Sequence, residues 1–194
     1  TVHTPRARIR AERVVLAMNA WAARWAEIRQ AIVVVSGDVV MTPPIGEQLE
    51  RIGWRDGLGL SDGRALVHYY RTTPDGRIAF GKGGMSGEFC WGGHIGAEVE
   101  GASAIAPVIA RGLMRTFPAL GEVEIASSWR GPVDRSDSGL PLFWHLRDAP
   151  NVFYGVGFSG NGVGPCHLAG QILASLALGQ RDEWAECPLV RPPR

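Results

Sequence analysis

The segment from Asn151 to Gly164 constrains the fold of this chain most, and its sequence is NVFYGVGFSGNGVG. It begins as a short apolar strand, continues as a glycine-dense loop and leads into CHLAGQILASLALG, a run with the composition of a helix. Pro165 stands where the first turn of a helix tolerates proline. Glycine-dense backbone turns sharply or approaches another group closely, and bare amides at a helix start attract anions. The segment therefore predicts a strand, a loop and a helix in succession, with a binding site at the loop.

The same segment contains a match to the dinucleotide motif G-x-G-x-x-G, from Gly155 to Gly160. That motif has meaning only inside a βαβ unit, whose second strand carries an acidic residue about 20 positions further on. Here the expected helix ends near Gly179, and the tail QRDEWAECPLVRPPR contains no apolar strand. The context therefore argues against a dinucleotide-binding unit at this loop.

Composition and charge exclude several classes of function. The chain has 194 residues, 45% of them hydrophobic and 20% charged, which is typical of a globular protein of one or two domains. A net charge of +1 gives no electrostatic basis for a nucleic acid or an anionic membrane as partner. The three cysteines and five histidines show neither a disulfide framework nor metal-ligand spacing. We therefore expect a cytoplasmic protein with no metal, no nucleic-acid partner and no membrane partner.

Hydrophobic patterning predicts a mixed α+β chain. The expected strands are 8–11, 14–17, 31–44, 65–73, 78–81 and 124–130, and the expected helices are 20–31, 45–52 and 104–117. The apolar burst at 14–17 predicts a central strand covered on both faces. Gly37 predicts a bulge or a bend in its strand. A turn at 74–77 joins the two flanking strands into a hairpin. The run from Lys82 to Gly96 predicts a long loop, typical of a lid or a mobile segment, and 132–141 predicts turns.

Four segments together resemble the FAD-dependent amine and amino-acid oxidoreductases, the family of D-amino-acid oxidase, glycine oxidase and sarcosine oxidase. They are RAERVVLAMNAW (10–21), YYRTTPDGRIAFG (69–81), WRGPVDRSDSGLP (129–141) and NVFYGVGFSGNGVGPCHLAGQILASLALG (151–179). The segments occur in the family's order and span most of the chain, and the likeness is greatest to the γ-glutamylputrescine oxidase-like branch. Members of the family normally begin with a true βαβ unit that holds the ADP half of FAD, and this sequence has no such unit upstream.

The resemblance implies a division of the fold. Residues 31–130 would form a substrate-binding domain with a mixed, largely antiparallel sheet and flanking helices. Residues 1–30 and 131–194 would supply the last strands and the C-terminal helix of an FAD-binding domain. Because the N-terminal βαβ unit is absent, the resemblance also implies a partner, the N-terminal FAD-binding portion of the same protein.

The resemblance assigns the glycine loop to the flavin. Backbone amides of Gly160, Asn161, Gly162 and Val163 would hydrogen-bond a flavin carbonyl, and the helix dipole would stabilise negative charge on the ring. The alternative is a helix-start turn that only packs against the sheet.

Three further residues are implied as cofactor contacts. Ala17 and Asn19 belong to the strand-end turn that faces the cofactor in the family, and Trp129 belongs to the family's W-x-G segment. A plain helix cap explains Asn19 equally well.

The strand HYYRT supplies the expected substrate contacts Tyr69, Tyr70 and Arg71. Because neighbours on a strand face opposite sides, either Tyr69 and Arg71 or His68 and Tyr70 point towards a substrate. Core packing or cross-strand pairing is the alternative for the aromatic residues.

The segment after Trp129 departs from the family pattern. Glycine-oxidase-like members carry an arginine shortly after the W-x-G glycine, which grips the substrate carboxylate. Pro132, Val133 and Asp134 occupy those positions here, so Arg130 or Arg71 would have to substitute. An amine would instead suit Asp134 or Asp137, although both are equally explained as turn formers.

The function implied is an FAD-dependent oxidoreductase that takes a hydride from a carbon bearing an amine nitrogen and yields an imine. Its substrate would be a small amine or amino acid. The alternative is a non-catalytic ligand-binding or interaction domain that keeps the scaffold without the cofactor-binding half.

Overall fold

The computed structural model describes residues 1–54, 56–63, 67–83, 95–96 and 101–193, so most of the predicted loop from Lys82 to Gly96 lies outside the described residues. The described residues divide into two compact units. Unit 1 comprises those of 1–34 and 133–193, and unit 2 those of 35–132. The boundaries predicted from the sequence were 30/31 and 130/131. Assigning the units to FAD and substrate remains a prediction.

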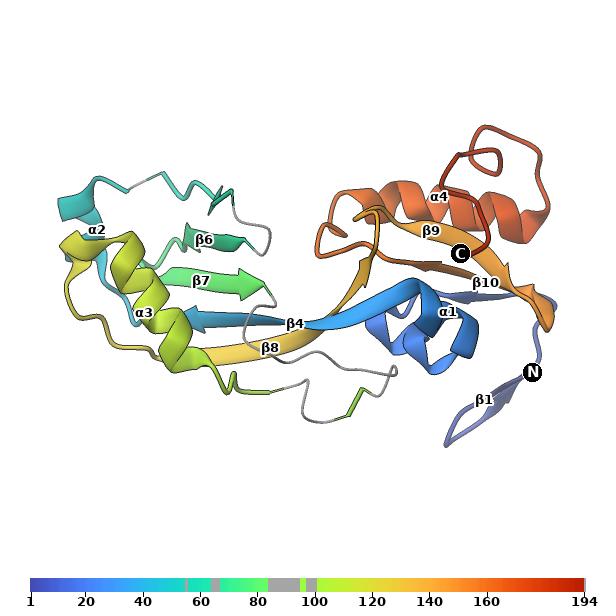
Figure 1. Ribbon diagram of the computed structural model, residues 1–194, viewed down its shortest axis with the longest axis horizontal. Coiled ribbons are helices and arrows are strands. Elements are labelled where there is room, and N and C mark those ends of the chain that lie inside the picture. The colour runs from blue at the N-terminus through green and yellow to red at the C-terminus, as the bar shows by residue number, and fades with distance from the viewer. Residues whose placement is uncertain (55, 64–66, 84–94, 97–100, 194) are drawn as a thin grey trace. The chain divides into compact units, whose positions relative to one another are not determined.

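Unit 1 is built on a three-stranded sheet in the order β3-β10-β9 (Figure 1). The strands are β3 (Val14–Leu16), β9 (Leu142–Leu146) and β10 (Ala149–Val156); β10 runs parallel to β3 and antiparallel to β9. Helix α4 (Pro165–Leu178) packs on one face and buries Ile172 and Leu173 against Phe143. The short helices η1 (Asn19–Arg24) and α1 (Ala26–Ala31) lie on the other side. A two-residue ladder of β1 (Val2–His3) and β2 (Arg8–Ile9) precedes them.

Unit 1 differs from the sequence-based expectations in places. Within the described residues, β3 lies at the edge of its sheet, where the sequence predicted a central strand: it pairs with β10 alone, and Val15 is 43% exposed. The single helix predicted at 20–31 is interrupted at Trp25, whose backbone is extended (φ −82°, ψ 126°). The described tail after α4 forms no strand, as predicted, although Val190 makes an isolated β-bridge with Phe143. Strand β9 had no predicted counterpart.

Unit 2 is built on a five-stranded sheet in the order β5-β6-β7-β4-β8 (Figure 1). The strands are β4 (Ile32–Met41), β5 (Leu60–Ser61), β6 (His68–Thr72), β7 (Ile78–Gly83) and β8 (Ser127–Ser136). Both β4 and β8 contain a unit boundary. The helices are α2 (Gly46–Ile52), α3 (Ala106–Thr116) and η4 (Pro118–Leu120). Their apolar side chains bury Val40, Ile78 and Phe80 of one sheet face.

The hairpin and the helices predicted in unit 2 are confirmed. Strands β6 and β7 pair antiparallel with Thr72 opposite Ile78, and Phe117 ends α3 before Pro118. Strand β4 pairs with β7 from Gly37 to Met41, and the bulge or bend predicted at Gly37 stays a prediction.

The described residues contain no helix long and apolar enough to cross a membrane.

The turn-rich interpretation of 132–136 was wrong, because β8 continues to Ser136. Burial alternates along this stretch, with Asp134 and Ser136 buried and Arg135 exposed between them. That alternation is the signature of a strand with one covered face. The chain as a whole is therefore mixed α+β, with largely antiparallel sheets.

Candidate functional site

The loop after β10 turns on three residues with left-handed backbone. These are Gly157 (φ 83°), Ser159 (φ 56°) and Gly160 (φ 87°). A Cβ on Gly157 would also lie 3.0 Å from the Cβ of Ser136. One position earlier, a Cβ on Gly155 would lie 2.8 Å from the Phe143 ring. These glycines are therefore required by the backbone geometry or the packing of unit 1.

Two other glycines meet no such requirement. A Cβ on Gly162 would make ordinary contacts, the shortest 3.5 Å to Cys166 Sγ, and its φ is not left-handed. A Cβ on Gly170, inside α4, would meet no described atom within 4 Å. Glycine inside a helix costs about 1 kcal/mol relative to alanine. A residue that costs stability and serves no packing need points to a requirement for open space.

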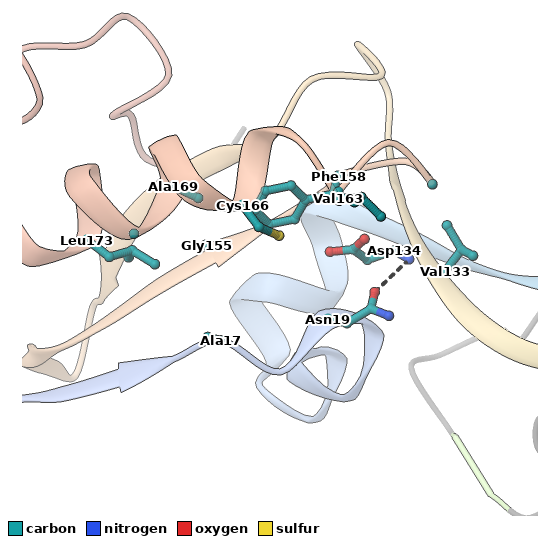
Figure 2. A pocket seen from close by; sticks show the side chains of 13 residues that line it. Ala17, Asn19, Val133, Asp134, Gly155, Phe158, Val163, Cys166, Ala169 and Leu173 are labelled. Carbon is teal, nitrogen blue, oxygen red and sulfur yellow. Dashed lines mark hydrogen bonds between the residues drawn. The ribbon is translucent and has the colours of Figure 1, made fainter.

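That space is a cavity of about 470 Å³ in unit 1 (Figure 2). Its wall combines the turn after β3, the end of β8, the glycine loop and the first half of α4. The lining residues are Ala17, Asn19, Val133, Asp134, Gly155, Phe158, Gly160, Gly162, Val163, Cys166, Ala169, Gly170 and Leu173. Most are small or apolar, and the volume falls in the range of small-molecule sites, roughly 300–1,000 Å³.

Unpaired backbone donors lie at one end of this cavity. Pro165 has no N–H, and Cys166 and His167 already donate to the carbonyls of Gly162 and Gly164. The N–H groups of residues 162–164 find no acceptor among the described residues, and Val163 is 99% exposed. Such donors at a helix start attract an anion or a carbonyl oxygen.

Asp134 lies behind the loop and is 1% exposed. Its carboxylate Oδ2 accepts the N–H of Gly157 at 2.6 Å, and its main-chain carbonyl accepts the N–H of Ser159 at 2.9 Å. Burial raises the pKa of the carboxyl group, although N–H groups of Gly157, Phe158 and Ser159 favour the charged form. Asp134 is thus no turn former. Asp137 is one, since its Oδ1 accepts the N–H of Ser138 at 2.7 Å in an exposed turn.

Asn19 does not cap a helix. Met18 occupies the cap position of η1 and no side-chain bond caps that helix. Asn19 instead has left-handed backbone (φ 50°), and its amide oxygen accepts the N–H of Asp134 at 3.3 Å (Figure 2). The turn after β3 and the end of β8 are therefore joined beside the cavity.

A second cavity, of about 460 Å³, lies on one face of the sheet in unit 2. Its lining residues are Val39, Gly59, Leu60, Ser61, Tyr69, Tyr70, Arg71, Ala79, Gly81 and Trp129. The ring of Tyr69 lies on its cross-strand partner Gly81, where a Cβ would come within 2.2 Å of it. Tyr69 and Trp129 are 40% and 41% exposed, so both present aromatic surface.

The exposure of the β6 side chains shows which of them face this cavity side of the sheet. Tyr69 and Arg71 are exposed on it, whereas His68 is buried. The Tyr70 ring stacks on Phe80 at 5.1 Å and contacts Trp54 edge-on, so it belongs to the core of unit 2. Tyr70 is nevertheless among the residues that line this cavity, and its role as a substrate contact stays a prediction.

The residues predicted as cofactor contacts are divided between the two units. Ala17, Asn19, Gly160, Gly162 and Val163 line the cavity of unit 1 together. Asn161 is exposed in the same loop, and its N–H donates to the carbonyl of Phe158.

The remaining predictions fall in unit 2. Trp129 lines the second cavity beside Tyr69. Arg130 lines neither cavity, and its main-chain N–H donates to Gly101. The part of the chain that the structure describes holds no cluster of metal-ligating side chains.

Comparison with known proteins identifies the class. The model of the FAD dependent oxidoreductase (DAO) family matches residues 1–176, so this chain belongs to that family.

Individual relatives agree with the family match. The probable oxidoreductase OrdL of Haemophilus influenzae is 26% identical over 93% of this chain and 39% of that protein. The gamma-glutamylputrescine oxidoreductase of Escherichia coli is 29% identical over 94% of this chain and 40% of that protein. The chain thus spans about two fifths of the length of these relatives.

Solved structures show the same fold. Glycine oxidase from Geobacillus kaustophilus superposes with a TM-score of 0.63 at 20% identity, over 93% of this chain and 45% of that one. Fructosamine oxidase (Amadoriase II) from Aspergillus fumigatus reaches a TM-score of 0.73 at 16% identity, over 96% of this chain and 44% of that one.

The described residues fit one end of FAD. An apolar cavity walled by small residues accommodates a flat ring, and the free N–H groups of residues 162–164 match its carbonyl edge. The two glycines that the fold does not require leave that wall bare. The described part of unit 1 has no βαβ unit for the ADP half, because the only two strands that pair in parallel there, β3 and β10, are not consecutive in the chain.

Proposed function

We propose that this chain is part of an FAD-dependent enzyme that oxidises a small amine or amino acid to an imine. Bound FAD would supply the acceptor for a hydride leaving the carbon next to the nitrogen. Its ring would lie in the cavity of unit 1. The ADP half would be held by an N-terminal FAD-binding portion of the same protein, which accords with the share of the relatives that this chain spans.

One observation carries the proposal: Gly162 and Gly170 leave the cavity wall open at a cost that the fold does not need. The N–H groups of residues 162–164 would hold a ring carbonyl, together with the positive end of the α4 dipole. Fixed donors of this kind stabilise negative charge that develops during reaction. The apolar wall from Ala169 to Leu173 would exclude water.

The open sheet face of unit 2 is the proposed substrate surface. The exposed rings of Tyr69 and Trp129 offer flat surface to an alkyl amine, and a ring face also attracts an ammonium group. Arg71 offers a guanidinium for a carboxylate. Because Pro132, Val133 and Asp134 stand where the family carries an arginine, we expect amines to be preferred over α-amino acids.

The test is the visible absorption spectrum of the full-length gene product that contains this sequence. We expect bound flavin, bleached without oxygen by an amine and less by an α-amino acid. Absence of flavin from a folded, pure protein would contradict the proposal and favour a non-catalytic domain that keeps the scaffold. Bleaching by amino acids alone would reverse the substrate preference.

A further inference from the structure

We propose that Asp134 is a positioning residue whose carboxylate holds the glycine loop in the conformation that faces the cavity. The inference rests on the proposed function for the nature of the ligand, but not for the anchoring itself. Asp134 is a carboxylate on the covered face of a strand, 1% exposed, in a cavity wall made mostly of small and apolar residues.

The anchor is built from both parts of the residue. Oδ2 accepts the Gly157 N–H at 2.6 Å, a short bond of the kind made to a charged acceptor. The main-chain carbonyl of Asp134 accepts from Ser159, and its neighbour Arg135 forms a β-bridge with Phe158. The end of β8 therefore holds three consecutive loop residues.

The loop needs such a hold because its conformation is unfavourable. Ser159 is a non-glycine residue with left-handed backbone (φ 56°), placed between Gly157 and Gly160 in the same region. Such backbone persists only where its surroundings over-determine it. The Gly157 N–H donates to the carboxylate of Asp134 and the Ser159 N–H to its main-chain carbonyl, so one residue holds the loop on both sides of Phe158.

The anchoring also separates two sets of donors. Asp134 and its neighbours take the amides of residues 157 and 159 on the inner side, and those of 162–164 remain without an acceptor among the described residues. The carboxylate thereby fixes the part of the loop that precedes the proposed ligand contacts. The proposed role of Asp134 is to act through Gly157, to which its carboxylate is bonded.

The experiment compares Asp134→Asn and Asp137→Asn in the full-length protein. Both changes are isosteric and remove one charge, but Asp137 lies in an exposed turn, where its carboxylate accepts the N–H of Ser138. Amide hydrogen exchange of Gly157 and the dissociation constant of FAD are measured for each. An asparagine turns one acceptor oxygen into a donor that faces N–H groups, so the anchor weakens.

For Asp134→Asn we expect Gly157 exchange to accelerate at least about tenfold while residues 154–156 of β10 keep their protection. FAD binding should weaken about tenfold, and Asp137→Asn should match the parent in every measurement. Asp134→Ala should accelerate Gly157 exchange and weaken FAD binding more than Asp134→Asn does. If the alanine variant fails to fold, the asparagine variant alone tests the proposal. Unchanged exchange at Gly157, or equal acceleration throughout unit 1, would overturn the anchor. A parent without flavin would refute the proposed function alone, because exchange at Gly157 still tests the anchor.

Discussion

At the scale of the residue, the glycines of unit 1 that look alike in the sequence have different physical reasons. Gly157 and Gly160 supply left-handed backbone, and Gly155 gives room to the Phe143 ring. Gly162 and Gly170 do neither and border the cavity. A substitution series can therefore separate glycines that serve the fold from those that serve a ligand.

Gly170→Ala should raise the free energy of unfolding by about 0.5–1 kcal/mol, since alanine is the better helix former. The same change should weaken FAD binding by the full-length protein, because the new methyl group would stand in the cavity wall. Gly155→Ala is the contrasting variant and should lower the free energy of unfolding by about 1–3 kcal/mol through overpacking against Phe143. Denaturant unfolding and flavin titration measure both. A stabilised Gly170→Ala variant with unchanged FAD affinity would contradict the role of the cavity.

Burial also affects the ionisation of Tyr154 in unit 1. Its ring is fully buried, and its hydroxyl finds no hydrogen-bond partner among the described residues. Burial, and secondarily the charge of Glu27, raise its pKa above the ordinary value of 10.0. Above that ordinary value the unfolded chain releases the proton and the folded chain keeps it. Stability from this group is therefore complete below about pH 10 and is lost as pH rises further.

Tyr154→Phe should remove this alkaline loss of stability. At neutral pH the variant should be at least as stable as the parent, because an unsatisfied buried hydroxyl costs about 1–3 kcal/mol. Thermal unfolding between pH 7 and about pH 11 measures the difference. A marked loss of stability at neutral pH would show that the hydroxyl has a partner after all.

At the scale of the element, the hairpin of β6 and β7 was predictable because its turn and its alternation agree. The sequence did not predict which face of β6 is buried, because both faces carry aromatic or polar side chains. Packing decides this: α2, α3 and η4 cover the side of Tyr70 and Phe80, so Tyr69 lies over Gly81 on the other side.

Gly81→Ala should displace the Tyr69 ring, because a Cβ there would lie 2.2 Å from its atoms. The Tyr69 side chain is partly exposed and can rotate away, so the cost should be only about 0.5–1 kcal/mol. Burial, and then the charge of Asp38, raise the pKa of Tyr69 above 10.0 in the parent. In the variant that pKa should fall back towards its ordinary value. An absorbance titration of phenolate measures this pKa, and the Tyr69→Phe variant identifies which titration step belongs to Tyr69. An unchanged pKa in Gly81→Ala would contradict the contact between the ring and Gly81.

At the scale of the whole molecule, two units each carry one candidate cavity, and unit 1 holds residues from both ends of the chain. The cavity wall of unit 1 joins Ala17, Asp134 and Gly170, which lie far apart in the sequence. The cavity proposed for the ring end of FAD lies in unit 1, whose described residues contain no βαβ unit for the ADP half.

We expect the isolated 194-residue chain to bind FAD weakly or not at all, since most of the affinity for a dinucleotide would come from the missing contacts. Quenching of flavin fluorescence during titration measures the affinity. Micromolar binding would refute the expectation and show that unit 1 suffices. The full-length gene product serves as the positive control.

Much of the candidate site was predictable from local sequence. The strand, glycine loop and helix at 151–179 follow from apolar alternation, glycine density and Pro165, and the structure confirms them as β10, a loop and α4. The places of Ala17 and Asn19 beside that loop came from the resemblance to the family. Asp134 was recognised as a notable acid, but its dense surroundings of Asp, Ser, Gly and Pro favoured a turn over the strand that forms.

The sequence by itself determined the family, the mixed α+β class and the glycine loop, because each is written in contiguous residues and their spacing. Only the tertiary structure decided that β3 pairs with β10, that Asp134 accepts the Gly157 N–H, and that the Tyr70 ring stacks on Phe80 while Tyr69 is exposed over Gly81. The physical reason is the same in each case. Strand order, burial and hydrogen-bond partners depend on residues distant in the chain, and no local pattern specifies which distant backbone a side chain will meet.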